Sequence, residues 1–327
     1  MESSATGRIL TQEELQQFHD VGYVVAESVL PTEELDPVID ELNQEIDARA
    51  RALYDEGALS NLYEDAGFET RLARISQETD ELALAIWSGV LHGPAIFHLI
   101  TNPNLVNIAE QLVGDEIVAS SVYRLRPKIP NYGKGEVPWH QDSGYFEPYC
   151  DNDLVVTMWL PLVDATEANG CLYVMPNSHR SPVVRHIKSK TGNYLQIDPS
   201  EFPRTGKRVA CPVRKGGVLL MTNRTAHASF KNTTEQVRWS MDLRYQNAAL
   251  PTNAGITRLA GEAVFDEEHD IPVACYPPEA DFLVRSAQRP DEVVADPKRF
   301  TEIREKHVKQ PVSDRFGLRE TESFTAG

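Results

Sequence analysis

The hydrophobic pattern of this chain changes at Glu116, and the change limits the folds that the chain can adopt. Before Glu116, apolar residues recur at three- and four-residue steps, which is typical of helices that bury one face. After Glu116, the apolar runs are short, and Gly, Pro and Asn separate them, as in strands joined by turns. Helices followed by many short strands predict an α+β fold with an antiparallel sandwich or jelly roll.

The helical part opens with a capping box in which Thr11 is the N-cap and Glu14 is the N3 residue. We expect this helix to end at Gly22 and a brief strand to follow at 23–25. Pro37 must lie in the first turn of the next helix or bend it. Apolar periodicity predicts further helices from 32 to the 49–53 region, over 69–87, and between Asn102 and Gly114.

The second part of the chain consists of short apolar or alternating runs that we expect to be strands. They lie at 117–125, 154–163, 171–175, 208–212, 218–221, 226–231 and 237–246. Beyond residue 251 the chain is rich in Pro and charge, and only 297–308 has a helical pattern. We expect this tail to pack over the core or to cover the site. We treat 1–327 as a single domain, with mainly helical support at 1–115, the jelly-roll core at 116–247 and a C-terminal extension at 248–327.

The composition excludes several classes of function. The 327 residues carry a net charge of −17, which argues against a nucleic-acid surface. The first ten residues lack the apolar stretch of a signal peptide, and no apolar run is long enough to cross a bilayer. Four widely spaced cysteines without a CxxC pair favour reduced thiols in a cytoplasmic protein: Cys150, Cys171, Cys211 and Cys275. No pattern in the chain predicts an oligomeric state.

A candidate metal motif stands in the string His140-Gln141-Asp142. In an extended segment, side chains two residues apart leave the same face, so His140 and Asp142 can bind one ion while Gln141 points elsewhere. His227, in a predicted strand, is the best candidate for a third ligand. Two histidines and a carboxylate on one face of an ion are the ligand set of non-heme Fe(II) oxygenases.

The alternation of residues in the last two predicted strands indicates a polar interior. If His227 points inward, so does Ser229. The next strand would then turn Arg238, Ser240, Asp242 and Arg244 inward, and Trp239, Met241, Leu243 and Tyr245 toward the helices. A filled apolar core would penalise the inward set, so a hydrated or ligand-filled interior explains it better. The alternative is a buried Asp242–Arg244 network without a ligand.

Several strings together resemble the phytanoyl-CoA dioxygenase family of Fe(II)/2-oxoglutarate oxygenases. The first is Trp-His-Gln-Asp at 139–142, and the second is His227 followed by Ser229 and Arg238. Between them lie Trp-Leu-Pro-Leu at 159–162, Asn-Gly-Cys-Leu at 169–172 and Pro-Asn-Ser-His at 176–179. The resemblance spans residues 10 to 246, and the tail beyond residue 251 has no matching motif.

This resemblance implies a double-stranded β-helix with an N-terminal helical layer on one sheet. It also implies that His140, Asp142 and His227 hold Fe(II), and that Arg238 and Ser229 bind the distal carboxylate of 2-oxoglutarate. Trp159 would pack beside this co-substrate, and Arg124, Arg126 and Lys128 are candidates for one further contact. The implied reaction uses O2, with ascorbate as a supporting reductant, and hydroxylates a C–H bond with release of succinate and CO2. The carboxylate of Asp142 favours hydroxylation over halogenation, because it fills the position that a halide would need.

The substrate can be narrowed only to a polar or amphipathic small molecule. The candidate pocket residues mix aromatic and charged groups: Tyr132, Gln141, Tyr145, Phe146, Asp242, Arg244 and Asn247. Ordinary loop packing is the alternative for the aromatic ones. No basic cluster presents itself for the phosphates of an acyl-CoA. Two other functions remain open at this point: a cupin-like metal enzyme, such as an isomerase or epimerase, that does not use 2-oxoglutarate, and a catalytically silent jelly-roll protein that binds a ligand or partner.

Overall fold

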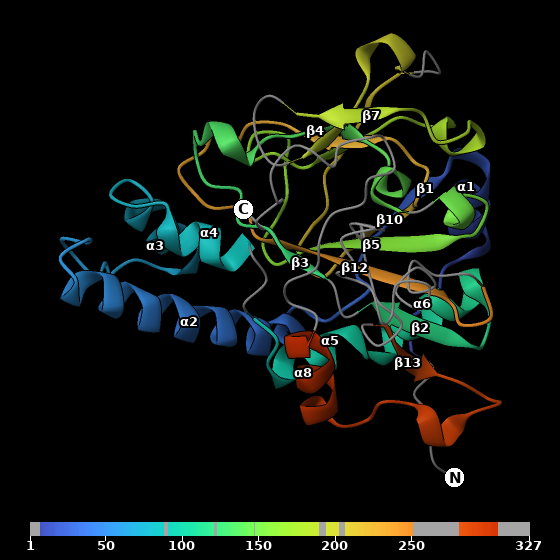
Figure 1. Cartoon of the computed structure of the whole chain (residues 1–327), viewed down its shortest axis with the longest axis horizontal. Helices are drawn as coiled ribbons and strands as arrows, with labels where there is room; N and C mark the ends of the chain where they lie inside the picture. Colours follow the sequence, from blue (N-terminus) through green and yellow to red (C-terminus); the bar gives the residue numbers. More distant parts are fainter. Residues whose placement is uncertain are drawn as a thin grey trace, which may run out of the picture.

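The computed structural model describes residues 7–87, 91–120, 123–146, 148–189, 194–202, 207–250 and 281–306. In these residues, helices pack beside antiparallel β-sheets (Figure 1). The mixture of helices and antiparallel strands confirms that part of the predicted class. No helix in the described part of the chain is both long and apolar enough to cross a bilayer.

Helix α1 (Gln12–Val21) begins and ends where the sequence predicts. The Thr11 hydroxyl accepts the backbone N–H of Glu14 at 3.2 Å, and the Glu14 carboxylate accepts the N–H of Thr11 at 2.7 Å. Gly22 ends the helix with φ 87°, a left-handed conformation that suits glycine. Strand β1 (Tyr23–Ala26) follows at once.

The longer helices of the first third also match their predicted positions. The 3-10 turn η1 (Thr32–Leu35) leads into α2 (Asp36–Asp55), which has Pro37 in its first turn. Asn102 caps α6 (Pro103–Val113) by accepting the N–H of Asn104 at 2.9 Å. Helix α5 (Pro94–Ile100) was not predicted. It is apolar around most of its circumference and therefore shows no amphipathic period.

The single helix expected at 69–87 was wrong, because the structure has two helices there. They are α3 (Phe68–Ile75) and α4 (Glu81–Trp87). Helix α3 ends at Ser76, whose backbone N–H caps it, and the Thr79 hydroxyl accepts the N–H of Glu81 at 3.3 Å at the start of α4. A hydroxyl that bonds a nearby backbone N–H competes with helix propagation, which favours a new helix start here.

The larger sheet has the strand order β1-β10-β5-β12-β2-β13, and β3 also pairs with β12. Its strands are β10 (Val218–Thr222), β5 (Val155–Pro161), β12 (Ser240–Asn247), β2 (Ile117–Ser120), β3 (Arg124–Leu125) and β13 (Asp281–Arg285). The run predicted at 117–125 thus contains two strands. Strand β13 was not predicted, because it lies in the Pro- and charge-rich tail.

The smaller sheet has the order β4-β11-β6-β9. Its strands are β4 (Val137–His140), β11 (His227–Ser229), β6 (Leu172–Val174) and β9 (Val209–Cys211). The histidine of the metal motif, His140, ends strand β4. Strands β7 (His186–Lys188) and β8 (Leu195–Ile197) pair as a separate ribbon. Further 3-10 turns are η2 (Gly133–Gly135), η3 (Asp142–Tyr145), η4 (Pro148–Cys150), η5 (Ser178–Arg180), η6 (Pro199–Glu201) and η7 (Pro290–Glu292).

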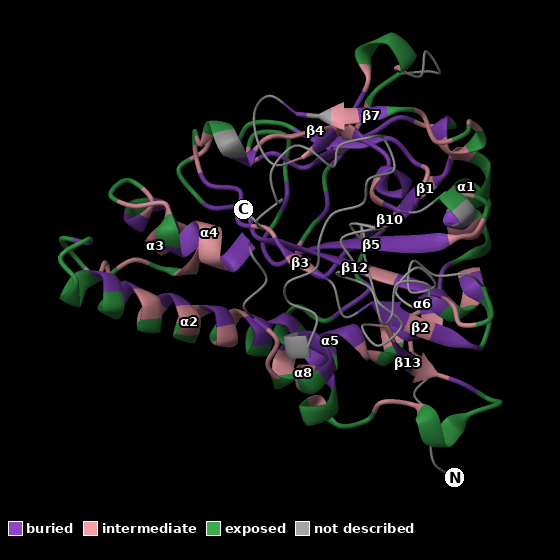
Figure 2. Cartoon of the chain, in the orientation of Figure 1, coloured by how far each residue is buried: buried purple, intermediate pink, exposed green. Residues whose placement is uncertain are grey.

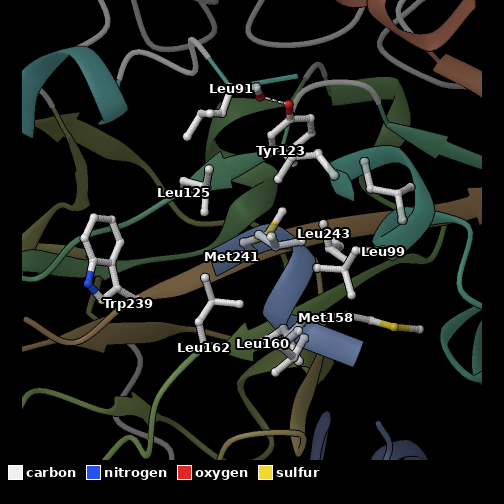
Figure 3. Close-up of a cluster of buried hydrophobic side chains, with 14 of the residues drawn as sticks. Leu91, Leu99, Tyr123, Leu125, Met158, Leu160, Leu162, Trp239, Met241 and Leu243 are labelled. Atoms are coloured by element: carbon white, nitrogen blue, oxygen red, sulfur yellow. Dashed lines mark hydrogen bonds between the residues drawn. The ribbon is translucent and has the colours of Figure 1, made fainter. Parts of the chain in front are cut away.

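The outer face of β12 packs against the helices, as the alternation of its residues predicts. Trp239, Met241 and Leu243 belong to one buried core (Figure 3). The Trp239 ring stacks on Phe68 at 5.0 Å between centroids, and the Tyr245 hydroxyl donates to a carbonyl of α5 at 2.7 Å. Buried residues accordingly follow the central strands and the inner sides of the helices (Figure 2).

The described part of the C-terminal tail packs on this same core. Phe300 and Ile303 of α8 (Pro297–Lys306) are buried in it, and the Phe300 ring lies 5.6 Å from that of Phe97. The expectation that the tail packs over the core or covers the site also concerns residues 251–280 and 307–327, which include Cys275 and lie outside the described residues.

Glu116 fastens the segment that follows β13 to the start of β2. Its carboxylate accepts the Ser286 hydroxyl at 2.6 Å and the backbone N–H groups of Ala287 and Gln288 at 2.8 and 2.9 Å. The Ser286 hydroxyl and these N–H groups hold the pKa of Glu116 below its ordinary value, against the opposing effect of desolvation. The anchorage of β13 therefore depends on an ionised carboxylate.

We predict that Glu116→Gln lowers the melting temperature at neutral pH and that its difference from the wild type shrinks in acid. A carboxyl whose folded-state pKa is depressed stabilises the fold above that pKa, and the contribution disappears as the pH falls through it. Thermal unfolding across the acid range measures the difference. Glu110→Gln is the matched control, because Glu110 pairs with Arg285 at the surface and should contribute little. Equal melting curves for Glu116→Gln and the wild type at neutral pH would contradict this role.

Candidate metal and co-substrate site

Two strands and a turn bring the predicted metal ligands together. His140 ends β4, Gln141 is extended with φ −108° and ψ 138°, and Asp142 begins η3. His227 begins β11 and is the cross-strand partner of His140. Paired residues of antiparallel strands share a face, so the two imidazoles lie side by side with centroids 4.2 Å apart.

The three side chains converge on one point. The Nε2 atoms of His140 and His227 lie 3.7 and 3.8 Å from Oδ1 of Asp142. All three residues are buried, and one ligand atom from each lies within 4.8 Å of the other two. Across the described ranges, no other group of three or more His, Cys, Asp or Glu side chains is this close. The arrangement offers two imidazole nitrogens and one carboxylate oxygen to a single ion.

Backbone carbonyls fix the tautomer of both histidines. Nδ1 of His140 lies 2.8 Å from the Pro138 carbonyl oxygen, and Nδ1 of His227 lies 2.9 Å from that of Thr225. A carbonyl oxygen only accepts, so each Nδ1 carries the proton. Each Nε2 consequently presents its lone pair toward Asp142, which is how a metal-binding histidine is oriented by its second nitrogen.

Asp142 is held by its other oxygen. Oδ2 accepts the Thr157 hydroxyl at 2.6 Å and Nε of Arg244 at 3.3 Å, which leaves Oδ1 turned toward the imidazoles. Burial by itself would raise the pKa of Asp142, but Arg244 and the two imidazoles hold it below its ordinary value. Burial, together with the neighbouring His227, lowers the pKa of His140 well below its ordinary value. An ionised carboxylate beside a neutral imidazole is the state that metal ligation requires.

The buried guanidinium of Arg238 is the other charged group of the candidate site. The side chain is only 2% exposed, and Nη2 donates to the Gly170 carbonyl at 3.1 Å and to the Ser229 hydroxyl at 3.3 Å. Nη1 donates to the Ser240 hydroxyl, and the guanidinium carbon lies 5.1 Å from the centre of the Trp159 ring.

The charge of Arg238 is not neutralised by an ion pair. Its Nε has no hydrogen-bond partner, and no carboxylate within the described ranges forms an ion pair with this guanidinium. Burial accordingly lowers the pKa of Arg238 to about 10. A buried guanidinium with unused donor capacity is suited to an incoming carboxylate.

The candidates for a further co-substrate contact are engaged with the protein. Lys128 Nζ donates to the carbonyls of Gly135, Ser229 and Phe230 at 2.7, 3.2 and 2.8 Å. These three bonds use all the donors of an ammonium group, so Lys128 ties strand β11 to the loop before β4. Two further bonds occupy the arginines: Nε of Arg126 binds Asp242 at 2.5 Å, and Nη1 of Arg124 donates to the Tyr123 carbonyl at 3.0 Å.

Of the residues predicted to contact substrate, Tyr145 and Arg244 lie directly at the triad. The Tyr145 ring meets the His140 ring edge-on at 5.8 Å, and its hydroxyl accepts the N–H of Leu195 at 2.8 Å. Arg244 binds Asp142 as described above. Of the two residues in the alternative network, Asp242 pairs with Arg126 and Arg244 pairs with Asp142.

Other residues that were predicted to contact the substrate bond instead to other parts of the protein. Gln141 is fully buried, and its carboxamide donates to the Arg224 carbonyl at 2.9 Å and accepts the N–H of Val184 at 3.0 Å. The Tyr132 hydroxyl donates to Asp80 at 2.8 Å, and its ring packs beside Trp87. The Asn247 carboxamide donates to the Val113 carbonyl at 2.7 Å. Phe146 is buried and lines a cavity that Arg244 also lines.

A buried histidine outside the predicted set braces the metal motif. Nε2 of His186 accepts the backbone N–H of Gln141 at 3.0 Å, while Nδ1 donates to the Val184 carbonyl at 2.8 Å. A Cβ at Gly144 would approach the His186 ring to 2.6 Å, so this glycine is needed for the close contact. Gly144 could have indicated that another group packs closely against the metal motif. No residue near it in the sequence identifies that group as His186, which comes 42 residues later.

Comparisons with known proteins place the chain in a family. It matches the sequence model of phytanoyl-CoA dioxygenase (PhyH) over residues 18–240. A phytanoyl-CoA dioxygenase of Arabidopsis thaliana is 26% identical over 275 residues, which are 74% of this chain and 95% of that protein. A probable alpha-ketoglutarate-dependent hypophosphite dioxygenase of Stutzerimonas stutzeri is 24% identical over 227 residues, which are 67% of this chain and 73% of that protein.

Among solved structures, EvdO2 from Micromonospora carbonacea var. aurantiaca, complexed with 2-oxoglutarate, is similar with a TM-score of 0.45. The two sequences are 23% identical, and the match covers 76% of this chain and 94% of the other. The sequence model of the family covers well over half of the chain. The protein therefore belongs to the phytanoyl-CoA dioxygenase family, whose members are non-heme iron oxygenases that use 2-oxoglutarate.

Proposed function

We propose that this protein hydroxylates a C–H bond of a small molecule, using Fe(II), 2-oxoglutarate and O2. The observation that carries the proposal is the convergence of two imidazole nitrogens and one carboxylate oxygen at a buried point. When bound, iron with 2-oxoglutarate and O2 supplies an oxidant strong enough for an unactivated C–H bond, and the co-substrate leaves as succinate and CO2.

The donor set suits Fe(II). His140, Asp142 and His227 would occupy one face of the ion and leave the opposite face to exchangeable ligands. The carbonyls of Pro138 and Thr225 keep both Nε2 lone pairs directed inward. The ionised state of Asp142 needs no proton release before the ion binds, since its pKa is already depressed.

The environment of Arg238 suits the distal carboxylate of 2-oxoglutarate. The orphan Nε shows that the guanidinium has a donor to spare, and the Ser229 hydroxyl, which donates to the Gly170 carbonyl at 2.9 Å, lies beside it. A charge-assisted bond of this type contributes about 1.5–3 kcal/mol. Trp159 covers one side of the guanidinium and excludes water from it. Arg238 would thus orient the co-substrate as well as bind it.

Asp142 bears on the outcome of the reaction. A halogenating enzyme needs a free position on the ion for a halide, and the carboxylate takes that position here. Thr157 and Arg244 hold the carboxylate by its other oxygen, so it keeps its orientation while other ligands exchange. The carboxylate therefore favours hydroxylation over halogenation.

We also infer that the two sheets form a double-stranded β-helix within a single domain. A shared apolar cluster supports this, since Trp159 and Leu219 of the larger sheet pack with Leu172 and Val174 of the smaller one. The burial of Phe300 in the main core supports including the C-terminal segment in that domain. The three described cysteines are free and buried, in line with the predicted reduced, cytoplasmic setting.

The two other functions considered from the sequence account for less of the site. A metal enzyme that does not use 2-oxoglutarate would leave the buried charge of Arg238 without a counter-ion, and such a charge is unfavourable. A silent binding protein would have no need for two histidines locked in the ligating tautomer beside an ionised carboxylate.

We predict that His227→Ala and Asp142→Ala each abolish Fe(II) binding and the release of succinate from 2-oxoglutarate. Each change removes one of three ligands from a site that has no described substitute. Calorimetric titration with Fe(II) under nitrogen and a succinate assay in air, with ascorbate, measure the two effects. His19→Ala, which removes an exposed histidine of α1, should behave as the wild type. A ligand variant that turned over 2-oxoglutarate normally would remove the triad from this role.

We predict that Arg238→Ala raises the KM for 2-oxoglutarate roughly 10- to 100-fold while Fe(II) binding persists. This range corresponds to losing one charge-assisted contact. Arg238→Lys should not restore the wild-type value, because an ammonium cannot reproduce the planar fork. Arg214→Ala, an exposed arginine, serves as the control. An unchanged KM in Arg238→Ala would show that the co-substrate carboxylate binds elsewhere.

A further inference from the structure

Three polar residues stand in one row across neighbouring strands of the larger sheet. Ser120 of β2 pairs with Asp281 of β13. On its other side β2 pairs with β12 through Ala119 and Tyr245, so one step along both strands brings Ser120 opposite Arg244. Ala119 and Tyr245 are part of the helix-covered core. Because side chains alternate along a strand, Arg244, Ser120 and Asp281 share the opposite, inner face.

This row lines a cavity that is linked to the triad through Arg244. Arg244, whose guanidinium binds Asp142, lies at one end of the row, and Asp281 lies at the other. Most of the remaining wall is apolar, with Val118, Phe146, Cys150 and Val155. Neighbouring strands are about 4.8 Å apart, so the backbones of Arg244 and Asp281 are separated by about 10 Å. The cavity thus has an acid at the end remote from the triad and apolar walls between.

Oδ1 of Asp281 differs from the carboxylates of the other acids near the site, because it has no partner among the described residues. Oδ1 of Asp281 is inaccessible to solvent, and no hydrogen bond to it is formed within the described ranges. Asp142 and Asp242, by contrast, each pair with an arginine. Burial raises the pKa of Asp281 well above its ordinary value, as expected for a carboxyl without a counter-charge. A buried carboxyl oxygen without a partner is unfavourable unless a ligand supplies one.

The complementary ligand group is a protonated amine. An ammonium group donates hydrogen bonds and carries the charge that a carboxylate lacks here, and the apolar walls suit a hydrocarbon stem. The net charge of −17 also raises the local concentration of cations. A molecule anchored by its nitrogen at Asp281 would extend its stem toward Asp142, several carbon atoms away.

We propose that this cavity is the subsite for the prime substrate and that Asp281 binds a protonated amine on a small, otherwise apolar molecule. The inference rests on the proposed function, because it takes the triad as the place of oxidation. It adds the chemical class of the substrate and the residue that selects it.

The experiment compares three probes that share one carbon chain: n-hexylamine, n-hexanol and n-hexanoate. Calorimetry on the full-length protein measures their binding, in the presence and absence of Fe(II) and 2-oxoglutarate. The wild type should bind n-hexylamine at least ~10-fold tighter than n-hexanol, the preference expected from one charge-assisted contact. Asp281→Asn, which keeps the shape and removes the charge, should abolish this preference. Asp291→Asn, an exposed acid in η7, should retain it.

Separate readouts distinguish this inference from the proposed function. Equal binding of the amine and the alcohol by the wild type, tighter binding of n-hexanoate, or an unchanged amine preference in Asp281→Asn would overturn the role of Asp281. Stimulation of succinate release by n-hexylamine in the wild type but not in Asp281→Asn would support it. Failure of the wild type to bind Fe(II) and 2-oxoglutarate would instead count against the proposed function, and the amine preference would still be decided by calorimetry.

Discussion

The pairing of β4 with β11 sets His140 opposite His227, and the rest of the site depends on this register. A shift of one residue would turn one imidazole to the other face of the sheet and leave Asp142 with a single nitrogen beside it. The same register carries Ser229 to the side of Arg238. Lys128 stabilises this arrangement, because its ammonium group holds the end of β11 through two carbonyl oxygens. The candidate metal site and the proposed co-substrate site are thus positioned by one short strand.

Strand β12 separates two environments that have opposite chemistry. Its outer side chains pack with the helices, where burial of apolar surface stabilises the fold. Its inner side chains are charged, and each described ion pair there joins β12 to a neighbouring segment, as Asp242 does with Arg126 and Arg244 with Asp142. Two inner ionisable groups outside β12 form no such pair among the described residues, Arg238 and Asp281, and these are the two for which we propose ligands. Unpaired charge in an otherwise paired interior is a physical guide to where small molecules bind.

Local chemistry explains which features could be predicted from the sequence. The capping box at Thr11 and the alternation along 237–246 depend only on residues that are close together in the sequence, and both were confirmed. The pairing of Asp142 with Arg244 joins residues 102 apart, and no local pattern contains that information. The same holds for His186, whose contact with the metal motif arises only when β7 folds beside it. Strand β13 was missed because its pairing with β2, rather than an internal period, makes it a strand.

The position of β13 has a consequence for how the protein is made. Strand β2 leaves the ribosome early, whereas its neighbour β13 is translated more than 150 residues later. Until then, one edge of β2 has unpaired backbone groups, and an exposed edge strand can pair with other chains. Glu116, at the start of β2, can engage Ser286 only after that late segment has emerged. Nascent chains that stall before this point would therefore depend on chaperones more than the finished protein does.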